Sequence, residues 1–196
     1  ALTSISNSAE ASTGKVKYSK NLIKRMVVAE AQVNGIVPPA LAMAVARVES
    51  NFQAHVKSSV GARGVMQIMP STAKGEFGVG ADRLWDPKVN IHLGVKYLAQ
   101  LYRQYDNRWD LALSHYNGGT IKNGKPHSYT RKYVSDVMGH WQNFQRSDII
   151  LAMADSDETK PVKVNEYKFG KKSQDHLNQR LAADYWLLDD PKTDKN

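Results

Sequence analysis

Residues 44–73 read AVARVESNFQAHVKSSVGARGVMQIMPSTA, and the rest of the chain is organised around this stretch. Pro38 and Pro39, just before it, suit the first turn of a helix, where a missing N–H costs nothing. Apolar residues then recur at helical spacing, at Leu41, Ala44, Val45 and Val48. The sequence therefore predicts a helix whose C-terminal end carries Glu49, the one acidic residue of the stretch.

The position of Glu49 predicts a raised pKa. The partial negative charge at a helix C-terminus disfavours a second negative charge, and the flanking Val48 and Phe52 would exclude water from the carboxyl group. Arg47 lies about 200° around the helix and does not offset this effect. A carboxylic acid that keeps its proton near neutral pH suits general acid catalysis, although an isolated glutamate at a helix end is more often a solvated group.

Glycines punctuate the chain after Glu49. Gly61 and Gly64 allow tight turns beside the acid, and Pro70-Ser71 predicts a short helix that ends at Gly78.

This run of residues resembles the signature of the soluble lytic transglycosylases, relatives of goose-type lysozyme. The matching residues are Glu49-Ser50, Ser58, Val60-Gly61-Ala62, Gly64, Met66-Gln67-Ile68-Met69-Pro70 and Thr72-Ala73. Further matches are Leu84, Asp86-Pro87, Asn90-Ile91, Gly94, Tyr97-Leu98 and the segment Tyr116-Asn117-Gly118. The resemblance covers residues 36–140 and implies a mainly α, lysozyme-like helical domain with a small C-terminal appendage.

The resemblance also implies a reaction, cleavage of the bond between N-acetylmuramic acid and N-acetylglucosamine in peptidoglycan. Most glycosidases place two carboxyl groups across the scissile bond, whereas this motif offers one. In the family's mechanism Glu49 would protonate the glycosidic oxygen and then accept the proton of the sugar's own C6 hydroxyl, which closes a 1,6-anhydro ring. The acetamido group of the muramic acid would support the charge at C1.

Five further residues take binding roles from the resemblance. Ser58 and Gln67 match positions that hydrogen-bond the sugar, Met69 matches one that packs on it, and Tyr116 and Asn117 match residues that line the sugar cleft. Met69 also fits a plain core role, the usual meaning of such a residue.

One position departs from the family pattern. Many members read Glu-Thr-Arg-x-Tyr-Val where this chain has Tyr129-Thr130-Arg131-Lys132-Tyr133-Val134. Tyr129 thus replaces a second acidic residue, which leaves open how the peptide stem or the distant sugars are held.

The charge is uneven along the chain. The formal net charge is +8, and residues 1–144 hold 18 basic and 9 acidic side chains, against 9 and 10 in residues 145–196. An anionic polymer is therefore the expected partner, either cell wall or nucleic acid. For nucleic acid the candidate surface is a basic patch with two aromatic neighbours, formed by Lys122, Lys125, Arg131, Lys132, Tyr129 and Tyr133.

Other features limit the function. No cysteine is present, which excludes disulfides, and the six histidines lack metal-ligand spacing, so we expect neither metal nor cofactor. No apolar run reaches the ~20 residues of a membrane span, so we expect a soluble protein. A start at Ala1 fits an exported, mature form. We therefore expect the protein to act in the periplasm or cell wall. Roles in cell remodelling or in a secretion, conjugation or phage assembly are all compatible with this location.

We expect three segments: a flexible arm at 1–18, the catalytic domain at 19–144 and an appendage at 145–196. Within the domain, apolar periodicity predicts helices at 19–34, from 87 for about five turns, at 109–117 and at 128–144, and it places Val33 inward. In the appendage, an amphipathic helix over 173–188 is expected to dock through Leu177, Leu181 and Leu188.

Two other functions remain open from the sequence. A lysozyme-type hydrolase would use Glu49 in the same way but deliver water to the sugar. A non-enzymatic module would bind wall or nucleic acid through the basic surface, but such a binder needs no acid at a helix end beside a glycine loop, so we expect no nucleic-acid partner.

Overall fold

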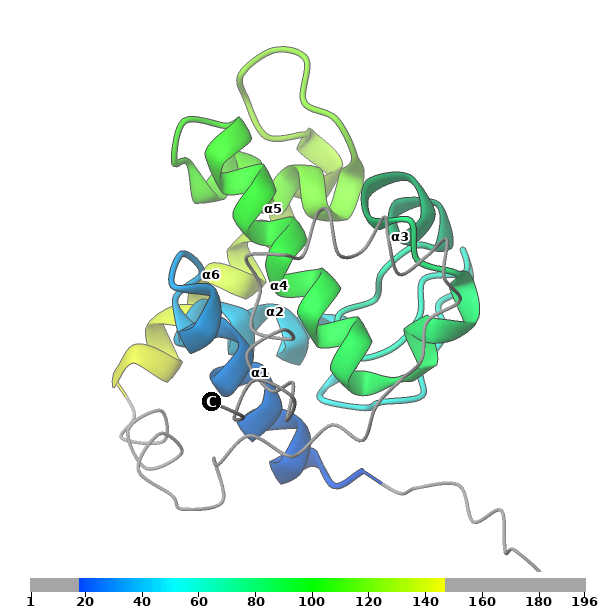
Figure 1. Cartoon of the computed structure of the whole chain (residues 1–196). Coiled ribbons are helices and arrows are strands. Elements are labelled where there is room, and N and C mark those ends of the chain that lie inside the picture. The colour runs from blue at the N-terminus through cyan, green and yellow to red at the C-terminus, as the bar shows by residue number, and fades with distance from the viewer. Residues whose placement is uncertain (1–17, 147–196) are drawn as a thin grey trace, which may run out of the picture.

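The computed structural model describes residues 18–146, which form a helical domain (Figure 1). The elements are α1 (Lys20–Asn34), α2 (Pro39–Ser50), α3 (Pro70–Phe77), η1 (Ala81–Trp85), α4 (Pro87–Gln104), α5 (Trp109–Gly118), η2 (Ser128–Thr130) and α6 (Arg131–Arg146). Within these residues the β-type pairing consists of isolated bridges from Arg63 to Lys57 and to Ile68. The predicted arm and the predicted helix over 173–188 lie outside the described residues.

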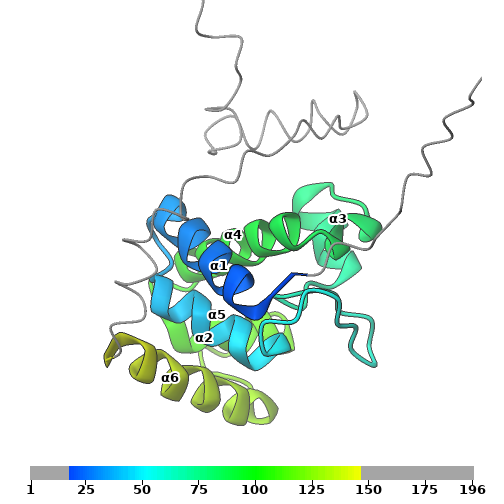
Figure 2. The ribbon, with the colours of Figure 1, turned by 90° about the horizontal axis from the view of Figure 1, so that it is seen from below.

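Helix α2 lies at the centre of the domain. Its residues 40–46 are all buried, and α1 and α6 pack against it (Figure 2). Four of these seven residues are alanines, whose small side chains let neighbouring helices approach closely. The polar end of α2 therefore projects from a helix that is held firmly by apolar packing.

Helix α1 follows its sequence signals except at one residue. The Ser19 hydroxyl accepts a hydrogen bond from Leu22 N at 3.1 Å, and Gly35 closes the helix in the left-handed conformation, with φ 70°. Val33 was expected to face inward, but it is 48% exposed, and Val28 and Ala31 are buried instead. In the last turn of α1, the face that the apolar pattern predicts as buried therefore differs from the face that packs on the core.

Helix α4 joins the remaining elements. It packs on α1, α5 and η1, and Glu30 of α1 pairs with His92 of α4 at 2.8 Å. Asp86 caps its N-terminus by accepting from Lys88 N at 2.9 Å, as the Asp-Pro pair predicts. The short helix η1 was not predicted from the sequence, and the predicted helix at 128–144 begins with the separate turn η2.

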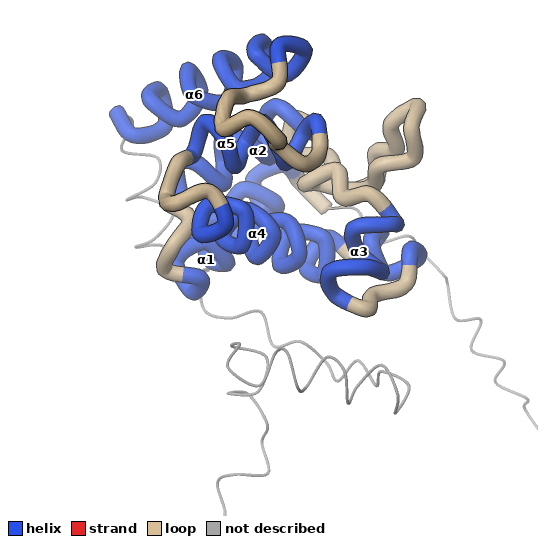
Figure 3. The backbone as a smooth tube through the Cα atoms, turned by 90° about the horizontal axis from the view of Figure 1, so that it is seen from above, coloured by secondary structure: helices blue, strands red, loops and turns tan. Residues whose placement is uncertain are grey.

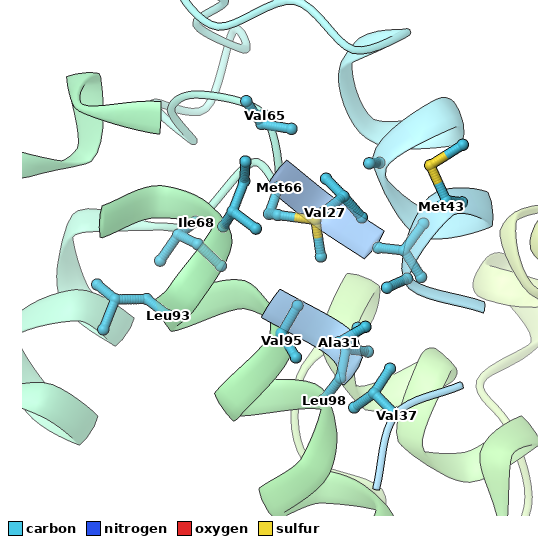
Figure 4. Close-up of a cluster of buried hydrophobic side chains, with 14 of the residues drawn as sticks. Val27, Ala31, Val37, Met43, Val65, Met66, Ile68, Leu93, Val95 and Leu98 are labelled. Atoms are coloured by element: carbon cyan, nitrogen blue, oxygen red, sulfur yellow. The ribbon is translucent and has the colours of Figure 1, made fainter. Parts of the chain in front are cut away.

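The glycine-containing loop between α2 and α3, residues 51–69, is the longest irregular connection in the described part of the chain (Figure 3). Its apolar residues Val65, Met66 and Ile68 point into the core, with Met66 among side chains from α1 and α4 (Figure 4). A Cβ on Gly94 of α4 would come within 2.5 Å of the Met66 side chain. The loop is therefore fixed by core packing at one end, even though its backbone is irregular.

Candidate active site

Glu49 occupies the last turn of α2, as predicted. The chain turns sharply just after it, because Asn51 and Phe52 both adopt positive φ, at 50° and 61°. This conformation is uncommon for residues other than glycine, and it places Phe52 in the core, where it is 2% exposed. Arg47 lies on the exposed side of α2 and bonds to Asn51, which agrees with its predicted position away from the acid.

The carboxyl group of Glu49 is held by Tyr133 of α6. The tyrosine hydroxyl donates a hydrogen bond to Glu49 Oε1 at 2.7 Å. Burial raises the pKa of Glu49 from 4.5 to about 7, and the hydrogen bond from Tyr133 opposes this rise in part. At neutral pH the carboxyl group is therefore poised between its protonated and ionised forms, as a group that donates and then accepts a proton requires.

Tyr116 of α5 lies near Glu49 and is hydrogen-bonded to the loop. Its hydroxyl donates to Met66 O at 2.8 Å, and burial together with the nearby Glu49 raises its own pKa well above 10. The ring of Tyr97 packs beside it, with centroids 5.6 Å apart. The neighbouring Asn117 is exposed at the end of α5, so its amide is accessible to a ligand.

Asn90 of α4 holds the loop by three hydrogen bonds. Its amide nitrogen donates to Arg63 O at 2.7 Å and to Leu84 O at 3.1 Å, and its amide oxygen accepts from Met66 N at 2.7 Å. Gly64, at φ +76°, lies directly against this amide, and a Cβ there would meet Asn90 Nδ2 at 2.4 Å. Close approach of Asn90 to the backbone therefore requires glycine at position 64.

Three of the predicted binding residues belong to this loop. The Ser58 hydroxyl accepts from Ala62 N at 3.0 Å, which closes the turn that contains Gly61. The Gln67 amide nitrogen donates to Val56 O at 3.1 Å and Gly64 O at 2.9 Å, from a backbone with φ 47°. Met69, unlike the buried Met66, is only partly buried, at the start of α3.

The junction between α5 and α6 carries Tyr129. Its hydroxyl donates to Gly118 O at 2.8 Å, and its ring stacks on His127 with centroids 4.9 Å apart. Beneath it, Ser114 and Thr130 are buried and share a hydrogen bond of 2.7 Å. This junction is therefore ordered by polar contacts, although Tyr129 itself is 69% exposed.

His115 and Tyr133 both have hydrogen-bonding partners near the site. His115 lies between Tyr105 and Tyr97, at 2.7 and 3.3 Å from their hydroxyls, and burial lowers its pKa, as for a structural residue. Tyr133, one of the two aromatic residues predicted beside the basic patch, donates its hydroxyl to Glu49; its stacking on a nucleic acid stays a prediction.

The roles of Tyr133 at Glu49 and of Asn90 in the loop are not predicted from the sequence. In α6, Tyr133 lies beside apolar residues such as Val134 and Val137, and a hydroxyl on an otherwise apolar face needs a partner, which is a signal that sequence reasoning can use. Asn90 was noted only as a family match; a polar residue within the buried stripe of α4 carried the same signal.

Within residues 18–146 no three His, Asp or Glu side chains gather closely enough to hold a metal ion. None of the helices in this range combines the length and the apolar character that crossing a membrane would need.

Comparison with known proteins identifies the family. Residues 26–138, more than half of the chain, match the family model described as the transglycosylase SLT domain. The soluble lytic murein transglycosylase of Escherichia coli K12 is 34% identical over 129 residues, covering 53% of this chain and 20% of the relative. A transglycosylase of Enterobacteria phage PRD1 is 35% identical over 112 residues, covering 56% of this chain and 40% of the relative.

A solved structure gives the same result. An inactive Glu-to-Gln mutant of lytic transglycosylase Slt from Pseudomonas aeruginosa superposes with a TM-score of 0.54 and 29% identity, covering 65% of this chain and 24% of that one. The chain thus spans about a fifth of the E. coli relative and a quarter of the solved chain. The matched segment covers more than half of the chain and the fold agrees with the solved structure, so the chain belongs to the SLT-domain transglycosylase family.

Proposed function

We propose that this protein is a murein lytic transglycosylase that cleaves the bond between N-acetylmuramic acid and N-acetylglucosamine in peptidoglycan. The observation that carries the proposal is the environment of Glu49, a carboxyl group with a pKa of about 7 held by Tyr133 in the matched domain. The relatives' names support the substrate, and the inactivity of a Glu-to-Gln mutant in one of them supports a catalytic glutamate.

The reaction uses Glu49 twice. The protonated carboxyl donates to the glycosidic oxygen as the C1–O bond breaks, so that N-acetylglucosamine leaves as an alcohol. The acetamido group of the muramic acid supports the positive charge at C1. The Glu49 carboxylate then accepts the proton of the C6 hydroxyl while O6 bonds to C1, giving a 1,6-anhydro end and restoring the acid.

Tyr133 has a positioning role in this scheme. A hydroxyl that donates to Oε1 fixes the orientation of the carboxyl group and leaves Oε2 for the proton that is transferred. The same bond stabilises the carboxylate formed after the first step, because hydrogen bonding to the charged form favours that form.

The binding residues surround this group. Gln67 uses its amide nitrogen within the loop, so its amide oxygen is the atom that would accept from a sugar hydroxyl. Asn117 and the partly buried Met69 would contact the sugar directly, and Tyr116 would keep the loop beside Glu49. The Ser58 oxygen accepts from Ala62 N, and its hydroxyl hydrogen would be the atom that donates to the substrate.

The place of action would be the cell wall outside the cytoplasm, where the proposed substrate lies. The phage PRD1 transglycosylase among the relatives supports a phage assembly as one machine that would use such an enzyme, beside secretion or conjugation machinery.

The experiment is mass spectrometry of fragments released from purified peptidoglycan by the wild type and by Glu49→Gln. We expect anhydro-terminated muropeptides from the wild type and at least about a thousandfold fewer from the variant, which cannot donate the proton. Reducing-end sugars would instead identify a hydrolase. Equal binding by both proteins without any cleavage would indicate a non-enzymatic module.

A further inference from the structure

Tyr129 is an exposed aromatic side chain that no part of the proposed reaction uses. Its residue is 69% exposed, whereas Tyr97, Tyr105, Tyr116 and Tyr133 are all partly buried. A single exposed aromatic residue needs no explanation by itself. The contacts that hold this one in place, and its position relative to Glu49, are what make it informative.

The ring of Tyr129 is fixed on three sides. One face stacks on the His127 ring at an interplanar angle of 14°, the hydroxyl donates to Gly118 O, and the ring edge lies where a Gly118 Cβ would be, 2.8 Å from Cε2. Gly118 therefore leaves the space that the ring occupies. An exposed tyrosine that is merely solvated would not need these contacts, since freezing an exposed side chain costs conformational entropy.

The fixed ring lies next to the residues around Glu49. Tyr129 lies in η2, directly before α6, and α6 carries Tyr133, which bonds to Glu49. Its hydrogen-bond partner Gly118 directly follows Tyr116 and Asn117 at the end of α5. The ring is therefore attached to the end of α5 that carries two of the proposed substrate-binding residues, at the junction of α5 and α6 that lies at the top of Figure 1.

We propose that Tyr129 is a sugar-stacking platform: its outer face binds a pyranose ring of the glycan strand beyond the scissile bond. This inference rests on the proposed function and names a further subsite for the same polymer. One face of an N-acetylhexosamine ring presents C–H groups, which pack on an aromatic face, and an aromatic ring that is already ordered binds at low entropic cost.

The chemistry differs from what an acidic residue would provide at this position. A glutamate would accept hydrogen bonds and would repel the carboxylates of a peptide stem, whereas a neutral ring makes apolar contact with the sugar itself. The exposed Lys122, Lys125 and Arg131 nearby add positive charge, so an anionic strand is attracted to the junction. The ring contact itself is with the sugar, so its contribution depends on glycan length and does not require the peptide stem.

Binding and cleavage of peptide-free glycan strands of defined length test this proposal. Affinity is measured in the Glu49→Gln background, which does not require turnover, with Tyr129→Ala, Tyr129→Phe and Tyr129→Glu compared. Removing the ring in Tyr129→Ala should weaken binding of long strands about tenfold and leave binding of disaccharides unchanged. Tyr129→Phe keeps the ring and should remain within about twofold of the unsubstituted background.

Cleavage kinetics separate a binding role from a structural one. In the active background Tyr129→Ala should raise KM about tenfold for long strands at nearly constant kcat, because the platform does not touch the reacting atoms. His127→Ala, which removes the supporting ring, should give a smaller rise in KM, of about threefold. Val33→Ala, at an exposed position on α1, is the matched control and should change neither constant.

The outcomes are distinguishable from those of the proposed function. If the wild type cleaves peptidoglycan but Tyr129→Ala binds and cleaves long strands normally, the platform is refuted and the reaction stands. Equal losses in Tyr129→Phe and Tyr129→Ala would also refute it, since the hydroxyl and not the ring would then matter. If no cleavage occurs but strand affinity still depends on the ring, the subsite stands and the reaction fails.

Discussion

The two regions that meet at Glu49 are built by different forces. The helical side, from α2, α5 and α6, is held mainly by apolar packing, and Tyr133 adds a hydrogen bond to the acid. The loop side, residues 51–69, shares the core through Val65, Met66 and Ile68, but its irregular backbone depends on backbone hydrogen bonds, positive φ angles and the amide of Asn90. Apolar packing sets the pKa of the acid, whereas the hydrogen-bonded loop sets where a sugar would lie against it.

The largest effect on stability is expected on the loop side, in Asn90→Ala. This change leaves Met66 N and Leu84 O without their Asn90 partner in a buried region, whereas Arg63 O keeps its hydrogen bond from Ile68 N. Because each buried, unsatisfied polar group costs about 1–3 kcal/mol, unfolding free energy should fall by about 4 kcal/mol. Denaturant unfolding measures this loss. Asn117→Ala, at an exposed position, serves as the control, and a loss below about 1 kcal/mol in Asn90→Ala would contradict the role given to its amide.

A pair of glycines compares the two sides directly. Gly64→Ala forces a Cβ to within 2.4 Å of Asn90 at φ +76°, and we expect a loss of about 3 kcal/mol. Gly139 lies on the exposed face of α6, and a Cβ there would have nothing within 4 Å. Gly139→Ala should therefore raise the free energy of unfolding by about 0.5–1 kcal/mol. Thermal unfolding of both variants provides the test; equal effects would show that the two sides do not differ in the way described.

Glu49→Gln should stabilise the protein in a pH-dependent manner. A folded-state pKa of about 7 against 4.5 means that the folded protein holds this proton more tightly, so the carboxyl group lowers stability as pH rises from 4.5 through 7. Replacing the carboxyl group in Glu49→Gln should raise the free energy of unfolding by nearly zero at pH 4 and by about 2 kcal/mol at pH 8. The value at pH 8 is smaller than the full pKa shift implies, because solvent at the partly buried carboxyl group screens part of the cost of burying its charge. Denaturation at both pH values measures the gain. A gain that does not grow with pH would be inconsistent with a raised pKa.

The smallest effect on stability is expected in Tyr133→Phe, at about 1 kcal/mol for one hydrogen bond. Its effect on activity should be clearer, a loss of about tenfold, with the alkaline limb of the pH–rate profile moved above pH 7. The alkaline limb moves to higher pH because the Tyr133 hydrogen bond lowers the pKa of Glu49, so removing this bond raises that pKa. Lys132→Ala, at the neighbouring exposed position, is the control; a limb that moves to lower pH would contradict this assignment.

The helical side was largely predictable from the sequence, and the loop side was not. Apolar periodicity and the Pro39, Asp86 and Gly35 signals place the helices to within a few residues, because these signals act locally. The raised pKa of Glu49 follows from its position at the end of an apolar helix. The hydrogen-bond partners of Asn90 lie 6 to 27 residues away in the sequence, so no local sequence pattern predicts them.

Tyr133 illustrates the same limit at the site itself. Its contact with Glu49 joins residues 84 positions apart, and helical periodicity alone assigns its face but not its partner. The family resemblance supplied the chemistry of Glu49 and the binding roles of five further residues, which remain predictions for this chain. The structure adds the hydrogen bond that orients the acid and the exposed ring of Tyr129.

The central claim is that Glu49 is an acid with a pKa near neutrality. The most direct measurement is a titration of its carboxyl carbon by NMR between pH 4 and 9 in protein labelled at glutamate, with Glu49→Gln identifying the resonance. We expect a midpoint near pH 7. A midpoint near 4.5 would contradict it, because Glu49 would then be ionised at neutral pH and unable to donate a proton to the glycosidic oxygen.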